Sequence, residues 1–579
     1  MVLFLPFRRL PVGLAVWLCL SATILANPSG EVVRHGEVIF AVDGASLQIL
    51  QASDQAIIEW DSFSIAPGET TNFSQPNARA IALNRVTGGS VSSIEGLLQA
   101  NGQVILSNRN GVLIGPNGRV DVSGFIATSL DISDANFLAG SDLSFEGSST
   151  SGAIVNLGTI NAHDGDVFLL GPMVTNRGVI LAPNGTVGLG GGTRVLIKAT
   201  GEERMFVEGT GSVVNEGAIE ANIAELKAHG GNVYATAIKN SGRVVATGVR
   251  QEGGQIFLTG RGSKIVNEGQ LRARRSDGSG GRVNMDASEG GEITLRANPI
   301  GPASSAIDAS GDTAGGGEIE LIADKIVIGE GFVVKADGVT HGGSVRMDAS
   351  DLTILGNVSA RGESGVGGIG DFTAENALIG PLATVDVSAE RVGGRVFLQA
   401  RDATIAGRIA ANANSGTGGE VAIQAERNLA IEPLARIEAT GDQGGSIFVE
   451  AHEAVVAGTL DASGIDGTGG QISLRAEDLL IQPTALVDVS GQTDGGKITV
   501  DATTSVIHGT LDASGKTGVG GIVTLRATDV TIGSTAVIDA SGYTDGGTIS
   551  LNADSADING MLDASGKTGV GGIVTLRAT

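Results

Sequence analysis

Cysteine is almost absent from this sequence of 579 residues. Its one cysteine, Cys19, lies in the apolar stretch at the N-terminus. The rest of the chain can therefore form neither an intramolecular disulfide framework nor a cysteine nucleophile. If such a chain is exported, its stability must come from packing alone.

Histidine and aromatic residues are scarce as well. The six histidines are scattered, and none forms a pair with the spacing of metal ligands. Aromatic residues make up 3% of the sequence, so the ring platforms on which sugars stack are nearly missing. No Gly-x-Ser-x-Gly elbow stands out, and no predicted helix follows the G-x-G-x-x-G match at Gly365. We therefore expect no catalytic residues, no metal site and no cofactor.

A basic surface is also lacking. The formal net charge is −25, from 38 lysines and arginines against 63 aspartates and glutamates. Binding to nucleic acid requires a basic face, so we expect no nucleic-acid partner. We interpret the acidity as the solvated surface of a soluble protein.

What the sequence has in abundance is repetition. Residues 511–528, LDASGKTGVGGIVTLRAT, recur without change at residues 562–579, which is 51 residues later. Within this unit a D-(A/V)-S-G tetrapeptide recurs at alternating spacings of 27 and 24 residues, and each copy leads into a G-G-x-(I/V)-x-(L/V)-x-A segment. Such periods are typical of solenoids. The tetrapeptides begin at Asp461, Asp488, Asp512, Asp539 and Asp563.

Each G-G segment alternates apolar and polar residues, which is the pattern of a strand with one buried face. A coil of about 20 to 27 residues cannot bury that face alone, whereas stacked coils bury it between parallel strands spaced roughly 4.8 Å apart. The sequence therefore predicts an all-β fold, a right-handed parallel β-helix. We expect the paired glycines to allow positive φ or close backbone approach, and the aspartates to cap turns, with calcium binding as the alternative.

A second repeat, N-x-G-x-(I/V/L), occupies the middle of the chain. Asparagine and glycine both tolerate the backbone conformations of tight turns. We therefore expect the asparagines to lie at one corner of successive coils, where their side chains can stack and hydrogen-bond along the axis. The repeat begins at Asn156, Asn176, Asn215, Asn240 and Asn267.

The N-terminus has the pattern of a secretory signal peptide. Arg8 and Arg9 precede an apolar core over residues 10–22, and Ala26 suits the position before cleavage. We expect cleavage after about residue 26, and export of the remaining chain.

Two stretches of the N-terminal part carry distinctive motifs. Residues 57–86 contain W-x-S-F-x-I, N-F-x-Q-P and A-L-N-R-V, and residues 101–140 contain N-G-V-L-x-G-P-N and S-L-x-I-x-x-x-x-F-L-A-G. In this order, the strings resemble the haemagglutination-activity domain of two-partner secretion exoproteins of the filamentous haemagglutinin type, over roughly residues 30–200. The resemblance implies a capped β-helix. It also implies that POTRA domains of a dedicated outer-membrane transporter recognise the chain in the periplasm, and that the transporter threads it to the surface.

The resemblance also implies which residues the transporter recognises. The family motif Asn-Pro-Asn-Gly reads Asn-Arg-Asn-Gly here, so Arg109 stands where the family has a proline that fixes φ. The downstream Gly-Pro-Asn-Gly turn keeps its proline. The expected recognition residues are Asn108, Arg109, Asn110, Gly111, Asn117 and Gly118.

We expect four regions: a signal peptide (1–26), a two-partner secretion domain (27–200), its continuation with N-x-G repeats (201–270), and a shaft of Gly-rich repeats (271–579) that is incomplete at its C-terminus. The basic stretch 272–281 is interpreted as a loop protruding from the shaft. The resemblance implies a secreted or surface-exposed adhesin or haemagglutinin-like protein with an unknown host or cell-surface receptor. The alternatives are the delivery stalk of a contact-dependent toxin or haemolysin, and a β-helical polysaccharide-active enzyme.

Overall fold

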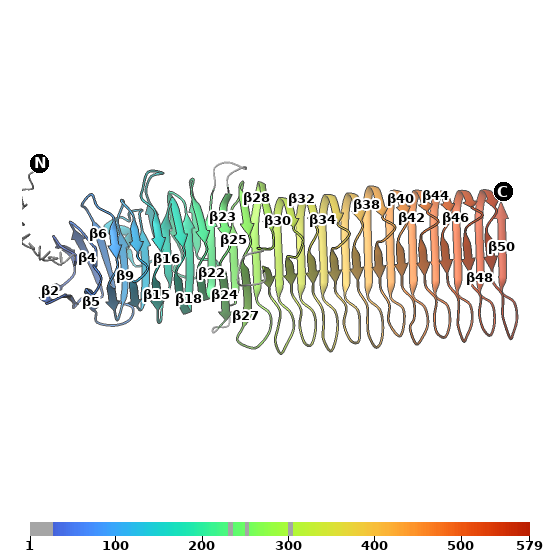
Figure 1. Cartoon of the computed structure of the whole chain (residues 1–579), viewed down its shortest axis with the longest axis horizontal. Coiled ribbons are helices and arrows are strands. Elements are labelled where there is room, and N and C mark those ends of the chain that lie inside the picture. Colours follow the sequence, from blue (N-terminus) through green and yellow to red (C-terminus); the bar gives the residue numbers. More distant parts are fainter. Residues whose placement is uncertain (1–26, 230–235, 249–253, 299–304, 579) are drawn as a thin grey trace, which may run out of the picture.

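The chain forms a long rod of stacked coils (Figure 1). The structure is a computed structural model that describes residues 27–229, 236–248, 254–298 and 305–578, so the signal peptide expected at residues 1–26 lies outside the described residues. Forty-seven strands join one continuous sheet that winds around the rod, and nearly all of its pairings are parallel. The predicted parallel β-helix is confirmed. No helix in the described residues is long and apolar enough to cross a membrane.

Antiparallel strands close the N-terminal end of the rod. β1 pairs with β4, and β2 forms a hairpin with β3, before β3 and β5 begin the parallel stacking. The Phe40 ring from the hairpin meets Trp60 edge-on, with ring centroids 5.6 Å apart, and thereby covers the end of the core. These strands are β1 (Val32–His35), β2 (Val38–Asp43), β3 (Ser46–Gln51), β4 (Gln55–Trp60) and β5 (Thr70–Ser74).

The N-terminal half of the rod is built from strands on three faces, and each face pairs with the same face of the next coil. The first of these strands are β6 (Ile81–Val86), β7 (Ser92–Ile94), β8 (Leu97–Ala100), β9 (Gln103–Ser107), β10 (Val112–Ile114), β11 (Arg119–Val122), β12 (Gly124–Thr128), β14 (Ile154–Asn156), β15 (Thr159–Ala162), β16 (Val167–Gly171) and β17 (Met173–Asn176). They continue as β18 (Val179–Gly191), β21 (Ser212–Asn215), β22 (Ala218–Ala228), β23 (Thr236–Asn240), β24 (Arg243–Gly248), β25 (Gln255–Thr259), β26 (Lys264–Asn267) and β27 (Gln270–Arg275).

The shaft repeats a simpler coil of one long and one short strand. The long strands are β28 (Arg282–Leu295), β30 (Glu318–Ile328), β32 (Ser344–Ile354), β34 (Ile369–Ile379), β36 (Arg395–Ile405), β38 (Glu420–Ile431), β40 (Ser446–Val456), β42 (Gln471–Ile481), β44 (Lys497–Ile507), β46 (Ile522–Ile532), β48 (Thr548–Ile558) and β50 (Ile573–Ala578). The short strands are β29 (Ala306–Asp308), β31 (Val333–Lys335), β33 (Asn357–Ser359), β35 (Thr384–Asp386), β37 (Arg408–Ala410), β39 (Arg436–Glu438), β41 (Thr459–Asp461), β43 (Leu486–Asp488), β45 (Thr510–Asp512), β47 (Val537–Asp539) and β49 (Met561–Asp563). The 51-residue spacing of the exact duplication therefore spans two coils.

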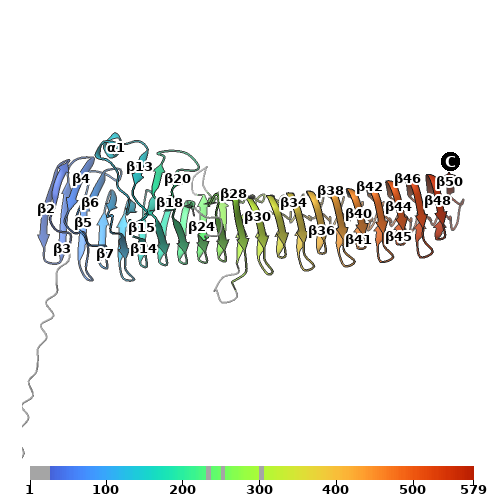
Figure 2. The same cartoon turned by 90° about the horizontal axis from the view of Figure 1, so that it is seen from above.

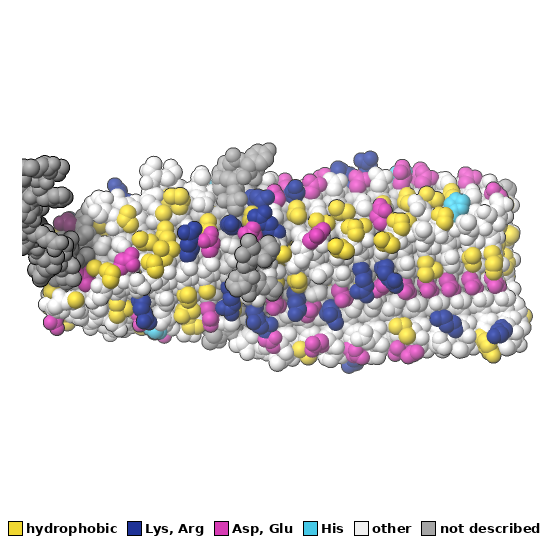
Figure 3. All heavy atoms as spheres, in the orientation of Figure 1, with side chains coloured by type: hydrophobic (Ala, Val, Ile, Leu, Met, Phe, Trp, Pro, Cys, Tyr) yellow, Lys and Arg dark blue, Asp and Glu magenta, His cyan; other side chains and the backbone are white. Residues whose placement is uncertain are grey.

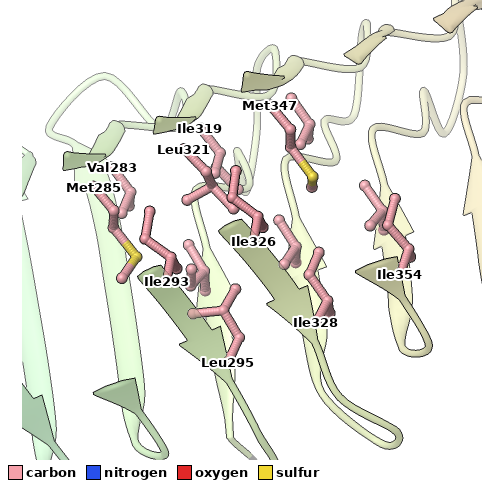
Figure 4. Packing of buried hydrophobic residues seen from close by; sticks show 14 of the residues in the cluster. Val283, Met285, Ile293, Leu295, Ile319, Leu321, Ile326, Ile328, Met347 and Ile354 are labelled. Atoms are coloured by element: carbon pink, nitrogen blue, oxygen red, sulfur yellow. The ribbon is translucent and has the colours of Figure 1, made fainter. Parts of the chain in front are cut away.

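Each long strand from β28 to β46 covers two faces of the shaft, because the alternation of its side chains breaks once. In β40 the side chains alternate inward and outward until His452 and Glu453, which are both exposed, and the alternation then resumes. The strand turns a corner there and directs apolar residues inward again. Figure 4 shows the result in the first shaft coils, where isoleucine, leucine and methionine side chains of neighbouring coils stack inside the rod.

The paired glycines are required by close backbone approach. A Cβ on Gly444 would clash with the carbonyl oxygen of Ala462, and one on Gly445 would clash with that of Gly419. Neither glycine has a positive φ. Of the two reasons offered by the sequence, close approach is the one that holds at this pair.

The asparagine repeat forms a buried ladder, as predicted. Asn156, Asn176, Asn215, Asn240 and Asn267 are each 0% exposed. Each side-chain amide donates to the carbonyl oxygen of the next asparagine at 2.7–2.8 Å, over four successive steps. The ladder satisfies polar groups that would be costly to bury alone.

The repeated aspartates cap turns, as predicted. Oδ1 of each accepts a hydrogen bond from the backbone N–H of the serine two residues later, at 2.7–3.0 Å. The five aspartates also lie directly opposite one another on successive short strands. Figure 3 shows acidic side chains in a row along the C-terminal part of the shaft.

One substructure lies outside the coils. The helix α1 (Asp134–Ala139) and a three-stranded antiparallel sheet of β13 (Leu143–Glu146), β19 (Arg194–Ile197) and β20 (Met205–Glu208) pack together on one side of the N-terminal half (Figure 2). They enclose a second apolar core that includes Phe137, Phe145 and Met205. Ser133 caps the start of the helix, where its hydroxyl accepts from Asn136 N–H, and Gly140 caps the end in the left-handed conformation.

The expectation of a basic loop at residues 272–281 is wrong for its first part. Residues 272–275 continue β27, because the buried Leu271 and Ala273 alternate with the half-buried Arg272 and Arg274. A turn begins only at Ser276.

Candidate functional site

The six residues expected to be recognised by a transporter lie on two corner turns of one coil. Residues 108–111 connect β9 to β10, and residues 115–118 connect β10 to β11. Because β10 has only three residues, the two turns lie at either end of one short face.

The buried side chain of Asn108 fixes the conformation of the first turn. Its side chain is 0% exposed, and its amide donates to the carbonyl oxygen of Ser90 and to the hydroxyl of Ser92, both at 2.9 Å. Its Oδ1 accepts from the backbone N–H of Asn110 at 2.9 Å. All of these contacts lie within the chain, so Asn108 holds the turn in place and its side chain is not open to a partner.

Two neighbours complete that turn. The Asn110 amide donates to the carbonyl oxygen of Gly88 at 2.9 Å, which fastens the corner to the preceding coil. Gly111 has φ +109°, and its N–H donates to the carbonyl oxygen of Asn108 at 2.8 Å. A side chain at Gly111 would be strained in this conformation and would also crowd the carbonyl of Ala153.

The second turn is tighter. Gly118 N–H donates to the carbonyl oxygen of Gly115 at 2.9 Å, and a Cβ at Gly118 would clash with the carbonyl oxygen of Ile94. Pro116 and Asn117 are exposed at the tip. The six residues thus divide into two sets: Asn108, Gly111 and Gly118 are buried, whereas Arg109 and Asn117 are exposed and Asn110 is half-buried.

A pocket of about 590 Å³ opens beside the first turn. Its floor is formed where β6, β9 and β12 end one above the other. Its remaining wall is the segment 146–151, which starts at the last residue of β13. Arg109 and Asn110 line this pocket together with Arg85. The sequence did not predict the pocket, because its wall belongs to the substructure outside the coils.

Arg85 is the most highly connected charge in the pocket. Its guanidinium donates to Asp131 at 3.0 Å, to Asp134 at 2.9 Å and to the carbonyl oxygen of Ile132 at 2.7 Å. Burial acts to lower the pKa of Arg85, but hydrogen bonds and charge from Asp131 and Asp134 outweigh it and raise the pKa above its ordinary value. Arg85 thereby ties β6 to the segment that starts α1. It belongs to the A-L-N-R-V motif, so the signal was present in the sequence, although its structural role was not evident.

Trp60 and Asn84 explain two further motif positions. Trp60 is 1% exposed, and its indole N–H donates to the Asn84 side chain at 3.0 Å. The tryptophan is therefore a buried core residue rather than a platform for a sugar.

The shaft offers no comparable cluster. In the portion of the chain that the structure covers, no group of three or more His, Cys, Asp and Glu residues is arranged to hold a metal ion. Burial raises the pKa of Asp488, and the charges of Asp512 and Asp461 on the adjacent strands raise it further, although hydrogen bonds from Ser490 oppose this. An open groove of about 820 Å³ crosses several coils, but its floor consists of the paired glycines that the backbone packing requires.

Comparison with known proteins agrees with this geometry. Residues 24–273 match the TPS secretion domain family. The chain is 32% identical over 258 residues to a heme/hemopexin-binding protein of Haemophilus influenzae, a match that covers 42% of this chain and 28% of that protein. It is 22% identical over 383 residues to the 16S rRNA endonuclease CdiA of Enterobacter cloacae subsp. cloacae, covering 62% of this chain and 11% of that protein. The chain thus spans less than a third of the length of either relative.

A solved structure is also similar. The crystal structure of the HMW1 secretion domain from Haemophilus influenzae aligns with a TM-score of 0.48 and 26% identity, over 71% of this chain and 98% of that one. The family match over residues 24–273 covers both corner turns and the pocket. Residues 24–273 therefore form a TPS secretion domain, which agrees with the resemblance of the N-terminal motifs to two-partner secretion exoproteins.

Proposed function

We propose that the coil carrying residues 108–118 is the surface by which a dedicated outer-membrane transporter, through its POTRA domains, recognises this chain in the periplasm. The observation that carries the proposal is the division of the two turns. Buried Asn108, Gly111 and Gly118 hold the corners rigidly, and they leave Arg109 and Asn117 exposed on the same short face. A rigid frame with outward side chains is suited to recognition, because little conformational entropy is lost on binding.

The shaft supports the second half of the proposal, which is that folding outside the cell assists export. Every coil pairs with the next one along the rod, and its core is made of neighbouring apolar side chains. A solenoid of this kind can add coils one at a time as the chain emerges. The exported rod then acts at the cell surface or in the medium as an adhesin or haemagglutinin-like protein, and it catalyses no reaction.

The test is secretion in a Gram-negative host. The full chain is expressed with and without its outer-membrane transporter, and the protein in the medium is quantified. We expect secretion to require the transporter and to fall on substitution of Arg109 and Asn117 together by alanine. The matched control is Asn184→Ala, because Asn184 is half-buried at the surface and lies on a later coil. Transporter-independent secretion would overturn the proposal.

The adhesive role has a separate test. Beads coated with the purified exported chain should bind host or bacterial cells, whereas beads coated with heat-unfolded chain should not. Equal retention of both would remove the adhesin from the proposal and leave the secretion step intact.

The delivery stalk of a contact-dependent toxin is a second candidate function. The match to CdiA favours it, because the match runs through 62% of this chain and is therefore longer than the TPS secretion domain. The deciding experiment is a co-culture in which bacteria that express this protein are mixed with bacteria that lack it. Contact-dependent growth inhibition of the second strain would favour the stalk over the adhesin.

A further inference from the structure

Arg109 is an exposed cation without a counterion in a strongly acidic protein. It forms no ion pair with any described residue, whereas Arg85, on the same pocket, is bound by Asp131 and Asp134. The whole chain carries a net charge of −25. An unpaired arginine at the rim of a pocket is therefore a local positive charge on a negative background.

The carboxylates of the pocket do not neutralise Arg109. Asp131 is bound by Arg85 at 3.0 Å, and Glu146 is bound by Arg194 at 3.1 Å. The rest of the wall consists of small and hydroxyl-bearing residues, among them Ser148, whose hydroxyl lies 2.8 Å from that of Thr150. The pocket thus has polar walls, a set of internally paired charges and one free guanidinium.

We propose that this pocket receives an acidic side chain of the transporter, and that Arg109 is its counterion. The inference rests on the proposed transporter recognition and specifies its chemistry. A guanidinium presents a planar fork of donors that binds a carboxylate in two-pronged fashion, so it selects for that partner. The related motif has an uncharged proline at this position, so the pairing is a specificity determinant of this chain and its own transporter.

The position tolerates substitution, which makes the inference testable. The Arg109 side chain is exposed, and the link to the opposite wall is made by its backbone carbonyl oxygen, which accepts from Gly152 N–H at 2.8 Å. A change of side chain keeps that bond. The turn itself is held by Asn108 and Asn110, so its geometry does not depend on the guanidinium.

The experiment uses the full chain with its outer-membrane transporter, and compares Arg109→Glu, Arg109→Pro and Arg109→Lys. The matched control is Arg79→Glu, because Arg79 is also exposed, forms no ion pair with the described residues and precedes β6, whereas the pocket lies at the opposite end of that strand. Secretion is measured in cells. The affinity of the purified chain for the detergent-solubilised transporter is measured at low and high salt.

We expect Arg109→Glu to weaken binding by about ten- to a hundredfold and Arg109→Pro by about tenfold, whereas Arg109→Lys retains most of the affinity. The salt dependence of the wild-type affinity should be reduced in Arg109→Pro, because the ion pair is then missing. Arg79→Glu should bind like the wild type. The secretion yields should follow the same order.

Two results overturn the inference, and they are distinguishable. If wild-type secretion does not need the transporter, the proposed function fails and the inference fails with it. If secretion needs the transporter but Arg109→Glu binds as tightly as Arg79→Glu, the proposed function stands and the acidic partner group alone is refuted. Circular dichroism of each purified variant shows whether the β-helix is intact, so that loss of folding is not read as loss of binding.

Discussion

The asparagine ladder allows a stability prediction that follows from counted hydrogen bonds. Asn215 lies in its middle, where Oδ1 accepts from Asn176 and the amide donates to Asn240, both at 2.8 Å. Replacement by alanine removes both bonds and leaves one amide and one carbonyl oxygen buried without partners. Each such group costs about 1–3 kcal/mol, so the variant should lose about 2–4 kcal/mol when water entering the new cavity compensates in part.

The end of the ladder supplies an internal calibration. Asn267 accepts from Asn240 at 2.7 Å, but its own amide reaches only Gly269 O, at 3.4 Å. Asn267→Ala therefore orphans one well-bonded group instead of two, and it should cost about half as much as Asn215→Ala, or about 1–2 kcal/mol. Asn184→Ala is the control outside the ladder, since the half-buried Asn184 side chain donates one hydrogen bond, to His163 O.

The assay must be local, because a long solenoid need not unfold in one step. Hydrogen exchange is therefore followed in peptides covering β21 and β22. A loss of about 2–4 kcal/mol in the opening free energy accelerates exchange there by about 30- to 700-fold. Peptides of the distant shaft should be unaffected. If Asn215→Ala exchanges no faster than Asn184→Ala, the ladder contributes nothing and the reasoning fails.

Three further predictions concern charge. Burial and neighbouring carboxylates raise the pKa of Asp488, so the folded state binds its proton more tightly than the unfolded state. Local stability should therefore rise as the pH falls through the raised folded pKa towards the unfolded pKa. Asp488→Asn should remove this pH dependence and stabilise the shaft at neutral pH by about 0.2–1 kcal/mol. Burial acts to raise the pKa of Glu438, but hydrogen bonds from two arginines and an asparagine outweigh burial and lower the pKa. The stability that the Glu438 carboxylate contributes should be present above the unfolded pKa and lost as the pH falls through the folded pKa. Hydrogen exchange of β39 should lose this pH dependence in Glu438→Gln. Lys227→Met leaves the Glu225 carboxylate, which is 0% exposed, without its cation. This should cost about 3–5 kcal/mol of stability and make β20 accessible to protease. The control Lys198→Met, at an exposed position, should resist cleavage like the wild type.

Patterns that recur in every coil could be predicted from the sequence. The spacing between Asp461 and its later copies predicted the length of one coil, and the alternation after each glycine pair predicted which strand face is buried. The hydrogen-bonding roles of the asparagines and aspartates followed for the same reason, since a residue at a fixed position in stacked coils must meet its own copy above and below.

Features that occur once could not be predicted in this way. β13 pairs with β19, where Leu143 lies opposite Ile197. The two strands are far apart in the sequence, and no repeat marks either of them. The pocket wall at residues 146–151 depends on that pairing, so the pocket was hidden even though Arg109 and Asn110 had been singled out. The prediction of a loop after Leu271 was wrong for another reason. The composition of this basic segment is typical of a loop, whereas its alternation of buried and outward residues is typical of a strand.

Asn108 is buried and Arg109 is exposed, and this difference decides how the secretion phenotypes of their variants are interpreted. Loss of the Asn108 side chain removes the bonds to Ser90, Ser92 and the Asn110 backbone, so a secretion defect at this position reports on the corner itself. Only variants that change an exposed side chain and leave those bonds in place report on contact with the transporter. A series at Arg109 meets this condition, because the turn is held from the buried side and the guanidinium takes no part in it. If recognition depends on the shape of the corner alone, the Asn108 variant fails to be secreted while every Arg109 variant is secreted normally; if it depends on charge as well, the two positions fail independently.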